Sequence, residues 1–276
     1  MFILKWWSFG HIMSIILPIV LIAITYLILK NRKEKTQRIV ILVLMLINVA
    51  QHLLKPYVWY PLYHGVYDIR NISFCNICAT SILLSPIIFI CKNDAFKDAC
   101  FYIGILGGIM SLWIVSVQYG NSILSIEFLR YFSCHTLLMI TSALPVLLGL
   151  QTLKLRNFWK VALIFLMYET IVFLDNFIIL SFENNFDWTY AYNTVYKENQ
   201  LFICHATSKE SLKNSPLKDF NMKYVIDDGT CFYIPVLWSA PAIFPFISGF
   251  TLLTMWICSK IKLNNHYLAI NNLKKE

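Results

Sequence analysis

Long apolar runs separated by short polar stretches dominate the pattern of the chain. A helix needs about 20 mostly apolar residues to cross the hydrocarbon core of a bilayer. Seven stretches meet this need and predict transmembrane helices over residues 11–29, 39–55, 72–91, 100–118, 128–149, 161–181 and 232–257. Residues 183–231 are polar and predict an extracellular loop insertion with little regular structure. The pattern predicts an all-α bundle of seven transmembrane helices, forming one transmembrane domain over residues 1–276.

The composition excludes a water-soluble fold. Hydrophobic residues make up 58% of the chain and charged residues only 14%, against about 45–50% and 25% in soluble domains. The net charge of +8 does not indicate nucleic acid binding, because the cations lie in short runs between apolar segments instead of on one basic surface.

The distribution of these cations predicts the orientation, since cytoplasmic connections are enriched in Lys and Arg. The connections after the first, third and fifth spans, with the C-terminal tail, hold 14 of them: Lys30, Arg32, Lys33, Lys35, Arg38, Lys92, Lys97, Lys154, Arg156, Lys160, Lys260, Lys262, Lys274 and Lys275. The short segments on the other side hold only Lys5, Lys55, Arg70 and Arg130. We expect a multi-pass protein of the cell membrane, with the N-terminus outside and the C-terminus cytoplasmic. The first apolar run is expected to be a retained span, because its positive cluster follows it and no small-residue cleavage site ends it.

Small residues in the fourth span predict close helix packing. Gly104 with Gly108, and Gly107 with Ser111, form two overlapping small-xxx-small spacings that let helix backbones approach. This is a packing signal and indicates no function.

Four polar side chains in three different spans are predicted to meet in the outer leaflet. Cys75 lies ~6 Å below the outer end of the third span, and His135 lies ~11 Å below the outer end of the fifth. Asp175 and Asn176 lie ~9 Å before the outer end of the sixth span. Polar groups inside spans tend to face the bundle interior and mark function. A thiol, an imidazole and a carboxyl or amide can form an activated nucleophile that carries an acyl group as a thioester.

Cys75 is the preferred nucleophile, because Cys134 and His135 are neighbours on one helix and project about 100° apart. The chain has eight cysteines, but most lie in or beside apolar runs, where cysteine usually serves as a small hydrophobe. Only Cys204 and Cys231 fall in a polar segment, and whether they pair is left open.

Other polar residues near these positions are candidates for contact with substrate: Asn76, Arg130 and Glu169. Arg130 also fits a side chain that reaches toward lipid headgroups, and Glu169 lies nearer the midplane. His11, His52 and His64 lie near span ends, and no function is assigned to them.

Three short segments resemble a known family. Ile72-Ser73-Phe74-Cys75-Asn76-Ile77, Tyr131-Phe132-Ser133-Cys134-His135 and Leu174-Asp175-Asn176 are similar to segments of the YwaF-type integral membrane proteins, relatives of vertebrate transmembrane protein 164. By the order of spans the resemblance covers about residues 40–255. The chain departs from the family pattern at Asn185-Phe186, where the family has an Asn-Tyr pair, and in the 183–231 loop.

The resemblance implies a function. The vertebrate relative is a seven-span acyltransferase that moves fatty acyl groups between phospholipids with a cysteine and a histidine. By motif, these roles fall on Cys75 and His135. The hypothesis is therefore a Cys/His acyltransferase or acyl hydrolase that acts on phospholipid acyl esters, in which Asp175 or Asn176 orients the imidazole.

Two alternatives stay open. Cys75 and Cys78 form a Cys-x-x-Cys on one helical face, as in a membrane thiol oxidoreductase with Cys204 and Cys231 as a partner pair. The same polar layer could instead serve a non-enzymatic small-molecule binding or transport component. No phosphate loop, zinc motif or dinucleotide fingerprint is present, so the expected partners are membrane lipids, without cofactor, metal or nucleic acid. The oligomeric state does not follow from the sequence.

Overall fold

A computed structural model describes residues 3–5, 7–55, 72–113 and 122–189, with short pieces between residues 224 and 260. Six α-helices have named bounds within this part: α1 (Phe9–Leu29), α2 (Glu34–Leu53), α4 (Ile77–Ile90), α5 (Asp94–Trp113), α6 (Ile126–Leu147) and α7 (Phe158–Glu183). A 3-10 helix, η4 (Leu155–Asn157), leads into α7, and β1 (Tyr224–Val225) pairs antiparallel with β2 (Cys231–Phe232). The described chain is all-α apart from this two-residue pair.

These helices correspond to the first six predicted spans. Four stretches are long and apolar enough to cross a membrane: Phe9–Leu29, Glu34–Leu53, Asp94–Trp113 and Leu155–Glu183. Helix α4 is apolar but has only 14 residues, and α6 carries several buried polar side chains. The chain is therefore a membrane protein. Most of the predicted loop 183–231, with Cys204, and most of the seventh span 232–257 lie outside the described residues.

Two helices begin at positions that the apolar pattern does not give. Helix α4 starts five residues into the predicted span 72–91, because Asn76 adopts an extended conformation and its side chain accepts a hydrogen bond from the Ala79 N–H at 2.8 Å. Helix α5 starts at Asp94, six residues before the predicted span 100–118. The Asn93 side chain there accepts from the Ala95 N–H at 2.9 Å. Polar capping residues, which a search for apolar runs ignores, thus set both starts.

Contacts at one end of the bundle, named here the Cys75 end, show that consecutive helices alternate in direction. The His11 ring near the start of α1 lies 3.1 Å from the Trp113 carbonyl oxygen at the end of α5. Residue Ile3 forms an isolated bridge with Ser122, just before α6. The starts of α1 and α6 therefore lie beside the end of α5. The residues just before α4 also lie at this end, where they contact His52 near the end of α2 and Asn176 in the second half of α7.

The opposite end, named here the Asp98 end, is joined through a buried carboxylate. Asp98 in α5 accepts hydrogen bonds from the Asn157 amide at 2.8 Å, the Gln151 amide at 3.2 Å and the Lys154 backbone N–H at 3.3 Å. These donors come from the connection between α6 and α7. Asp98 is almost fully buried, so the carboxylate fixes this connection against α5.

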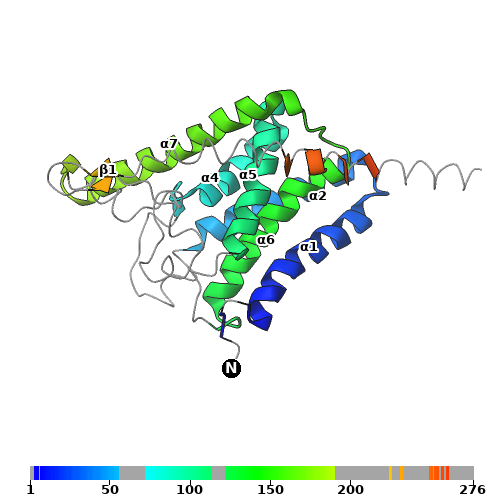
Figure 1. Cartoon of the computed structure of the whole chain (residues 1–276), viewed down its shortest axis with the longest axis horizontal. Helices are drawn as coiled ribbons and strands as arrows, with labels where there is room; N and C mark the ends of the chain where they lie inside the picture. The colour runs from blue at the N-terminus through cyan, green and yellow to red at the C-terminus, as the bar shows by residue number, and fades with distance from the viewer. Residues whose placement is uncertain are drawn as a thin grey trace, which may run out of the picture.

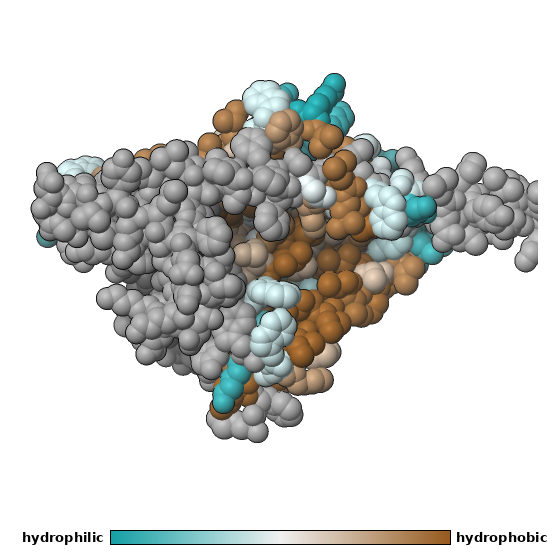
Figure 2. Space-filling view, viewed as in Figure 1, coloured by the Kyte–Doolittle hydropathy of each residue, from teal (hydrophilic) through white to brown (hydrophobic). Residues whose placement is uncertain are grey.

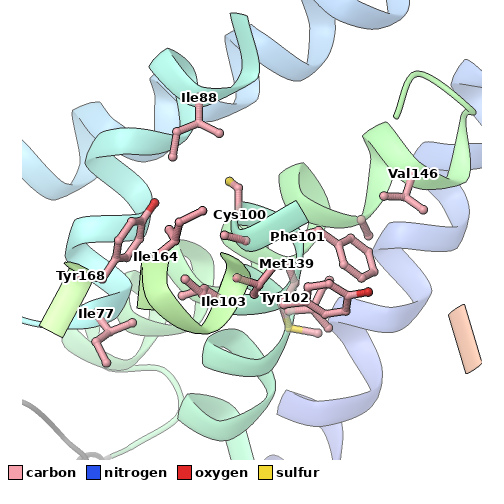
Figure 3. Close-up of a cluster of buried hydrophobic side chains, with 14 of the residues drawn as sticks. Ile77, Ile88, Cys100, Phe101, Tyr102, Ile103, Met139, Val146, Ile164 and Tyr168 are labelled. Atoms are coloured by element: carbon pink, nitrogen blue, oxygen red, sulfur yellow. The ribbon is translucent and has the colours of Figure 1, made fainter. Parts of the chain in front are cut away.

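Helix α6 occupies the middle of the bundle. It packs against α1, α2, α4 and α5, whereas α7 packs mainly on α5 and α4. Figure 1 shows α1 alongside α6 and α7 across the top of the view. The main core cluster gathers side chains of α4, α5, α6 and α7, as Figure 3 shows for Ile77, Phe101, Met139 and Tyr168. The central position of α6 explains why it tolerates polar residues, since neighbouring helices cover most of them.

Two of the small residues of α5, Gly104 and Gly108, lie against α6, in line with the close helix packing that their spacing predicts. A Cβ atom at Gly104 would overlap the Ser142 hydroxyl and lie 2.8 Å from the Ser142 Cβ, and one at Gly108 would overlap Met139. A Cβ at Gly107 would make only an ordinary contact of 3.4 Å with Cys78. Gly104 and Gly108 therefore let the backbones of α5 and α6 approach closely.

Helix α1 presents an apolar outer face. Its large exposed hydrophobic residues are Phe9, Ile12, Ile16, Leu17, Ile19, Val20, Ile24, Leu27 and Ile28. Figure 2 shows this face as a broad hydrophobic area with hydrophilic residues at both ends. Such a continuous apolar surface suits contact with lipid.

We predict that Gly104→Ala destabilises the protein in detergent by about 1–3 kcal/mol, the usual cost of overpacking. The matched variant Gly107→Ala has room for the methyl group and gains up to about 1 kcal/mol of helix propensity. Thermal unfolding of the two variants measures the difference. Equal unfolding midpoints would contradict the close α5–α6 approach.

We predict that Asp98→Ala lowers the free energy of unfolding by about 1.5–3 kcal/mol, because buried donors lose a charged acceptor. The control is Asp94→Ala, one turn earlier, which removes a half-exposed ion pair with Lys154. Its effect is expected to be much smaller, since exposed ion pairs contribute little. Denaturant titration compares the two, and a larger loss for Asp94→Ala would refute the anchoring role of Asp98.

Candidate functional site

Residues 73–76 enter the bundle without helical structure, just before α4. Cys75 is buried directly before the capping residue Asn76. The Asn76 amide nitrogen lies 3.5 Å from the Cys75 sulfur, while the Asn76 carbonyl oxygen accepts from the Thr80 N–H at 2.9 Å. The cap therefore holds the thiol at a fixed place over the first turn of α4.

Helix α7 contacts this segment through two predicted site residues. The Asn176 amide donates to the Val172 carbonyl at 2.8 Å and to the Cys75 carbonyl at 3.4 Å. Asp175, which is half-buried, forms hydrogen bonds with the Ser73 side chain and the Phe74 backbone and interacts electrostatically with Cys75. The structure thus places Cys75, Asn76, Asp175 and Asn176 together.

Helix α2 contacts the same segment from another direction. The buried His52 ring has its Nε2 atom 3.1 Å from the Ser73 carbonyl oxygen. Lys55, which follows α2, interacts electrostatically with both His52 and Cys75. Sequence reasoning gave neither residue a place in the site. Residues 56–71 separate them from the segment in sequence, so no periodic pattern relates the two.

His135 lies in α6, where neighbouring residues cover it. Its Nδ1 atom is 2.8 Å from the Tyr131 carbonyl oxygen, and its ring centroid is 4.3 Å from that of Tyr131. Because a carbonyl oxygen only accepts, Nδ1 carries the proton and Nε2 keeps the free lone pair that a general base requires. The ring is therefore held in the tautomer that base catalysis needs.

A chain of contacts connects His135 with Cys78 in the first turn of α4, three residues after Cys75. Tyr131 donates its hydroxyl to the Ser111 carbonyl at 2.8 Å, and the Ser111 hydroxyl lies 3.5 Å from the Cys78 sulfur. Within the described residues, no hydrogen bond joins His135 to Cys75, Asp175 or Asn176. The pairing of Cys75 with His135 stays a prediction.

Cys134 takes part in the contact between α2 and α6. Its sulfur donates to the Gln51 side-chain oxygen at 3.4 Å, and its carbonyl accepts from the Asn48 amide at 3.1 Å. The Ser133 hydroxyl donates to the same Gln51 oxygen at 2.8 Å. These bonds give Cys134 a packing role beside the candidate site.

The two remaining candidate residues, Arg130 and Glu169, lie at different depths in the bundle. Arg130 is half-buried in the first turns of α6 and interacts electrostatically with His52 and His135. Glu169 is buried in α7, and its carboxyl oxygens have no hydrogen-bond partner among the described residues. It is seven residues, or ~10 Å, deeper than Asn176 on the same helix face. Among the described residues, no three His, Cys, Asp or Glu side chains gather into a group that could hold a metal ion.

Comparison with known proteins identifies the family of the chain. No curated protein and no solved structure matches it. The model of the TMEM164 family matches residues 6–218, which include all six helices described above and every candidate residue of the site. Because this match covers well over half of the sequence, the chain belongs to the TMEM164 family.

Proposed function

We propose that the protein is a membrane-embedded acyltransferase or acyl hydrolase that acts on the acyl esters of phospholipids. The observation that carries the proposal is the buried Cys75 thiol, which lies in a fixed backbone segment. Polar side chains of α7 and α2 form hydrogen bonds that hold this segment. Non-helical backbone at membrane depth is costly, and it is tolerated where protein surrounds it. Because Cys75 lies in such a segment, surrounded by polar side chains of two other helices, the proposal assigns the nucleophile to it.

In the first half-reaction, the Cys75 sulfur attacks the carbonyl carbon of an acyl ester while His135 Nε2 takes the thiol proton. The tetrahedral intermediate collapses, the ester C–O bond breaks, and the imidazolium returns the proton to the departing lysophospholipid oxygen. The acyl group is then a thioester on Cys75. Backbone N–H groups at the start of α4 lie next to Cys75 and are of the kind that stabilise an oxyanion.

In the second half-reaction, His135 takes the proton from the hydroxyl group of a second lysophospholipid or of water. The hydroxyl oxygen attacks the thioester carbon, the C–S bond breaks, and the proton returns to the Cys75 sulfur. A lysophospholipid acceptor gives acyl transfer and water gives hydrolysis. Asp175 and Asn176 form hydrogen bonds with the thiol-bearing segment, so their proposed role includes holding that segment as well as orienting the imidazole.

Two cations at this end of the bundle, of which Lys55 interacts with the thiol itself, fit a phospholipid substrate. Lys55 interacts electrostatically with Cys75 and His52, and Arg130 interacts with His52 and His135. A phosphate group carries charge that such side chains recognise. In the proposal Arg130 and Lys55 bind the headgroup phosphate, while Asn76 and Glu169 contact other parts of the substrate.

The proposed orientation places the Cys75 end in the outer leaflet and the N-terminus outside. Cations of the described connections support it: those at the Asp98 end are Lys30, Arg32, Lys33, Lys35, Arg38, Lys92, Lys97, Lys154, Arg156 and Lys160. Such enrichment is typical of the cytoplasmic side. A seventh span over 232–257 would then return the C-terminus to the cytoplasm of a cell-membrane protein.

We predict that Cys75→Ala abolishes acyl transfer from a labelled phospholipid and that Cys75→Ser lowers it at least about 100-fold, because an unactivated hydroxyl is a poor nucleophile. Loss of the base in His135→Gln is expected to cost about 10²–10⁴-fold. Mass spectrometry of lipids and of the Cys75 peptide, trapped as a thioester, gives both readouts.

Cys78→Ser is the matched control, since serine can keep the contact with Ser111. It is expected to retain transfer. Absence of transfer in the wild type, with ligand binding or transport retained in Cys75→Ser, would instead favour a binding or transport component. Loss of electron transfer in Cys78→Ser would favour the thiol oxidoreductase.

The orientation predicts that a cysteine at Leu124, which is exposed at the Cys75 end, reacts with an impermeant maleimide in intact cells. A cysteine at the exposed Lys35 position is expected to react only after the membrane is permeabilised. Peptide mass spectrometry identifies the labelled site. The reverse pattern would invert the proposed topology.

A further inference from the structure

The carbonyl groups of the segment before α4 find no partner in the helix itself. The first backbone hydrogen bond of the helix runs from the Thr80 N–H to the Asn76 carbonyl. The carbonyls of Ser73 and Cys75 precede it and lie among buried groups. A buried carbonyl without a partner is costly, so each must be satisfied by another part of the chain.

The two partners come from two different helices. Asn176 of α7 donates to the Cys75 carbonyl at 3.4 Å, and His52 of α2 lies 3.1 Å from the Ser73 carbonyl. Because a carbonyl only accepts, His52 Nε2 carries the proton and donates it. His52 is 6% exposed, which leaves its ring little freedom to turn away. The backbone around the thiol is thus fixed on both sides.

Asp175 adds a third attachment to the same residues. It forms hydrogen bonds with the Ser73 side chain and the Phe74 backbone. Ser73 is therefore held through its hydroxyl by α7 and through its carbonyl by α2. Loss of the hydrogen bond from His52 would leave the carbonyl of Ser73, two residues before the thiol, without this partner.

We propose that His52 is a positioning residue for Cys75, which sets the place of the thiol by donating a hydrogen bond to the Ser73 carbonyl. The residue acts through the backbone and does not touch the substrate. Its catalytic consequence rests on the function proposed above, whereas its effect on the thiol can be measured without any substrate.

The experiment compares His52→Gln with His52→Asn in the full-length chain in membranes. A glutamine amide can place its nitrogen near the position of histidine Nε2, whereas the shorter asparagine amide reaches only the position of Nδ1. His52→Leu is the second variant without a donor for the Ser73 carbonyl. The first readout is the rate at which N-ethylmaleimide alkylates Cys75, followed by mass spectrometry of its peptide.

His11→Leu is the matched control. It removes another histidine whose Nε2 lies 3.1 Å from a backbone carbonyl, that of Trp113, at the same end of the bundle. A general loosening of the bundle would raise Cys75 alkylation in this variant as well. Positioning by His52 predicts no change in it.

We expect His52→Asn and His52→Leu to raise Cys75 alkylation about tenfold, the ratio that matches the loss of one net hydrogen bond. His52→Gln is expected to stay close to the wild type. In acyl transfer, His52→Asn and His52→Leu are expected to lower kcat with little change in KM. His52→Gln is expected to keep the kcat and the pH profile of the wild type.

Equal alkylation in the Gln, Asn and Leu variants, or an equal rise in His11→Leu, would overturn the proposal. A loss of kcat in His52→Gln with unchanged alkylation would also overturn it, because that result identifies a proton-transfer role. If the wild type transfers no acyl group, the proposed function fails, while the order of the alkylation rates still decides the role of His52.

Discussion

Polar groups inside a bilayer must find their partners within the protein, and this constraint shapes the bundle at both ends. At the Asp98 end, a single carboxylate accepts three hydrogen bonds from the connection between α6 and α7. At the Cys75 end, two carbonyls before α4 are satisfied by His52 and Asn176. Non-helical backbone can exist at these places because side chains of neighbouring helices replace the missing water.

The same constraint explains the central place of α6. Its middle turns carry Cys134, His135 and Thr136 in succession, all of them buried. A helix with this composition would be costly on the lipid-facing side of a bundle. Packing against four other helices removes that cost, and the close approach at Gly104 strengthens the contact with α5. The buried polar groups of α6 thus lie within a core that is mostly apolar, while the outer face of the bundle is apolar as well.

The bundle also separates two thiols that lie three residues apart in sequence. Cys75 is bound into contacts with α2 and α7, whereas Cys78 lies against Ser111 of α5, toward Tyr131 and His135. The proposed chemistry assigns the nucleophile to the thiol on non-helical backbone. The helical thiol has the surroundings of a packing residue, which gives the two sulfurs different environments despite their proximity in sequence.

The sequence by itself determined the helices and some of their packing, because both arise from local patterns: apolar runs about 20 residues long, and the Gly104–Gly108 spacing. It also singled out Cys75, Asp175 and Asn176 as unusual polar groups within spans. Only the tertiary structure decided what surrounds them. The bond from His52 crosses 21 positions to Ser73, and the one from Asn176 crosses 101 to Cys75. Contacts at such separations leave no periodic trace, since they depend on how whole helices pack.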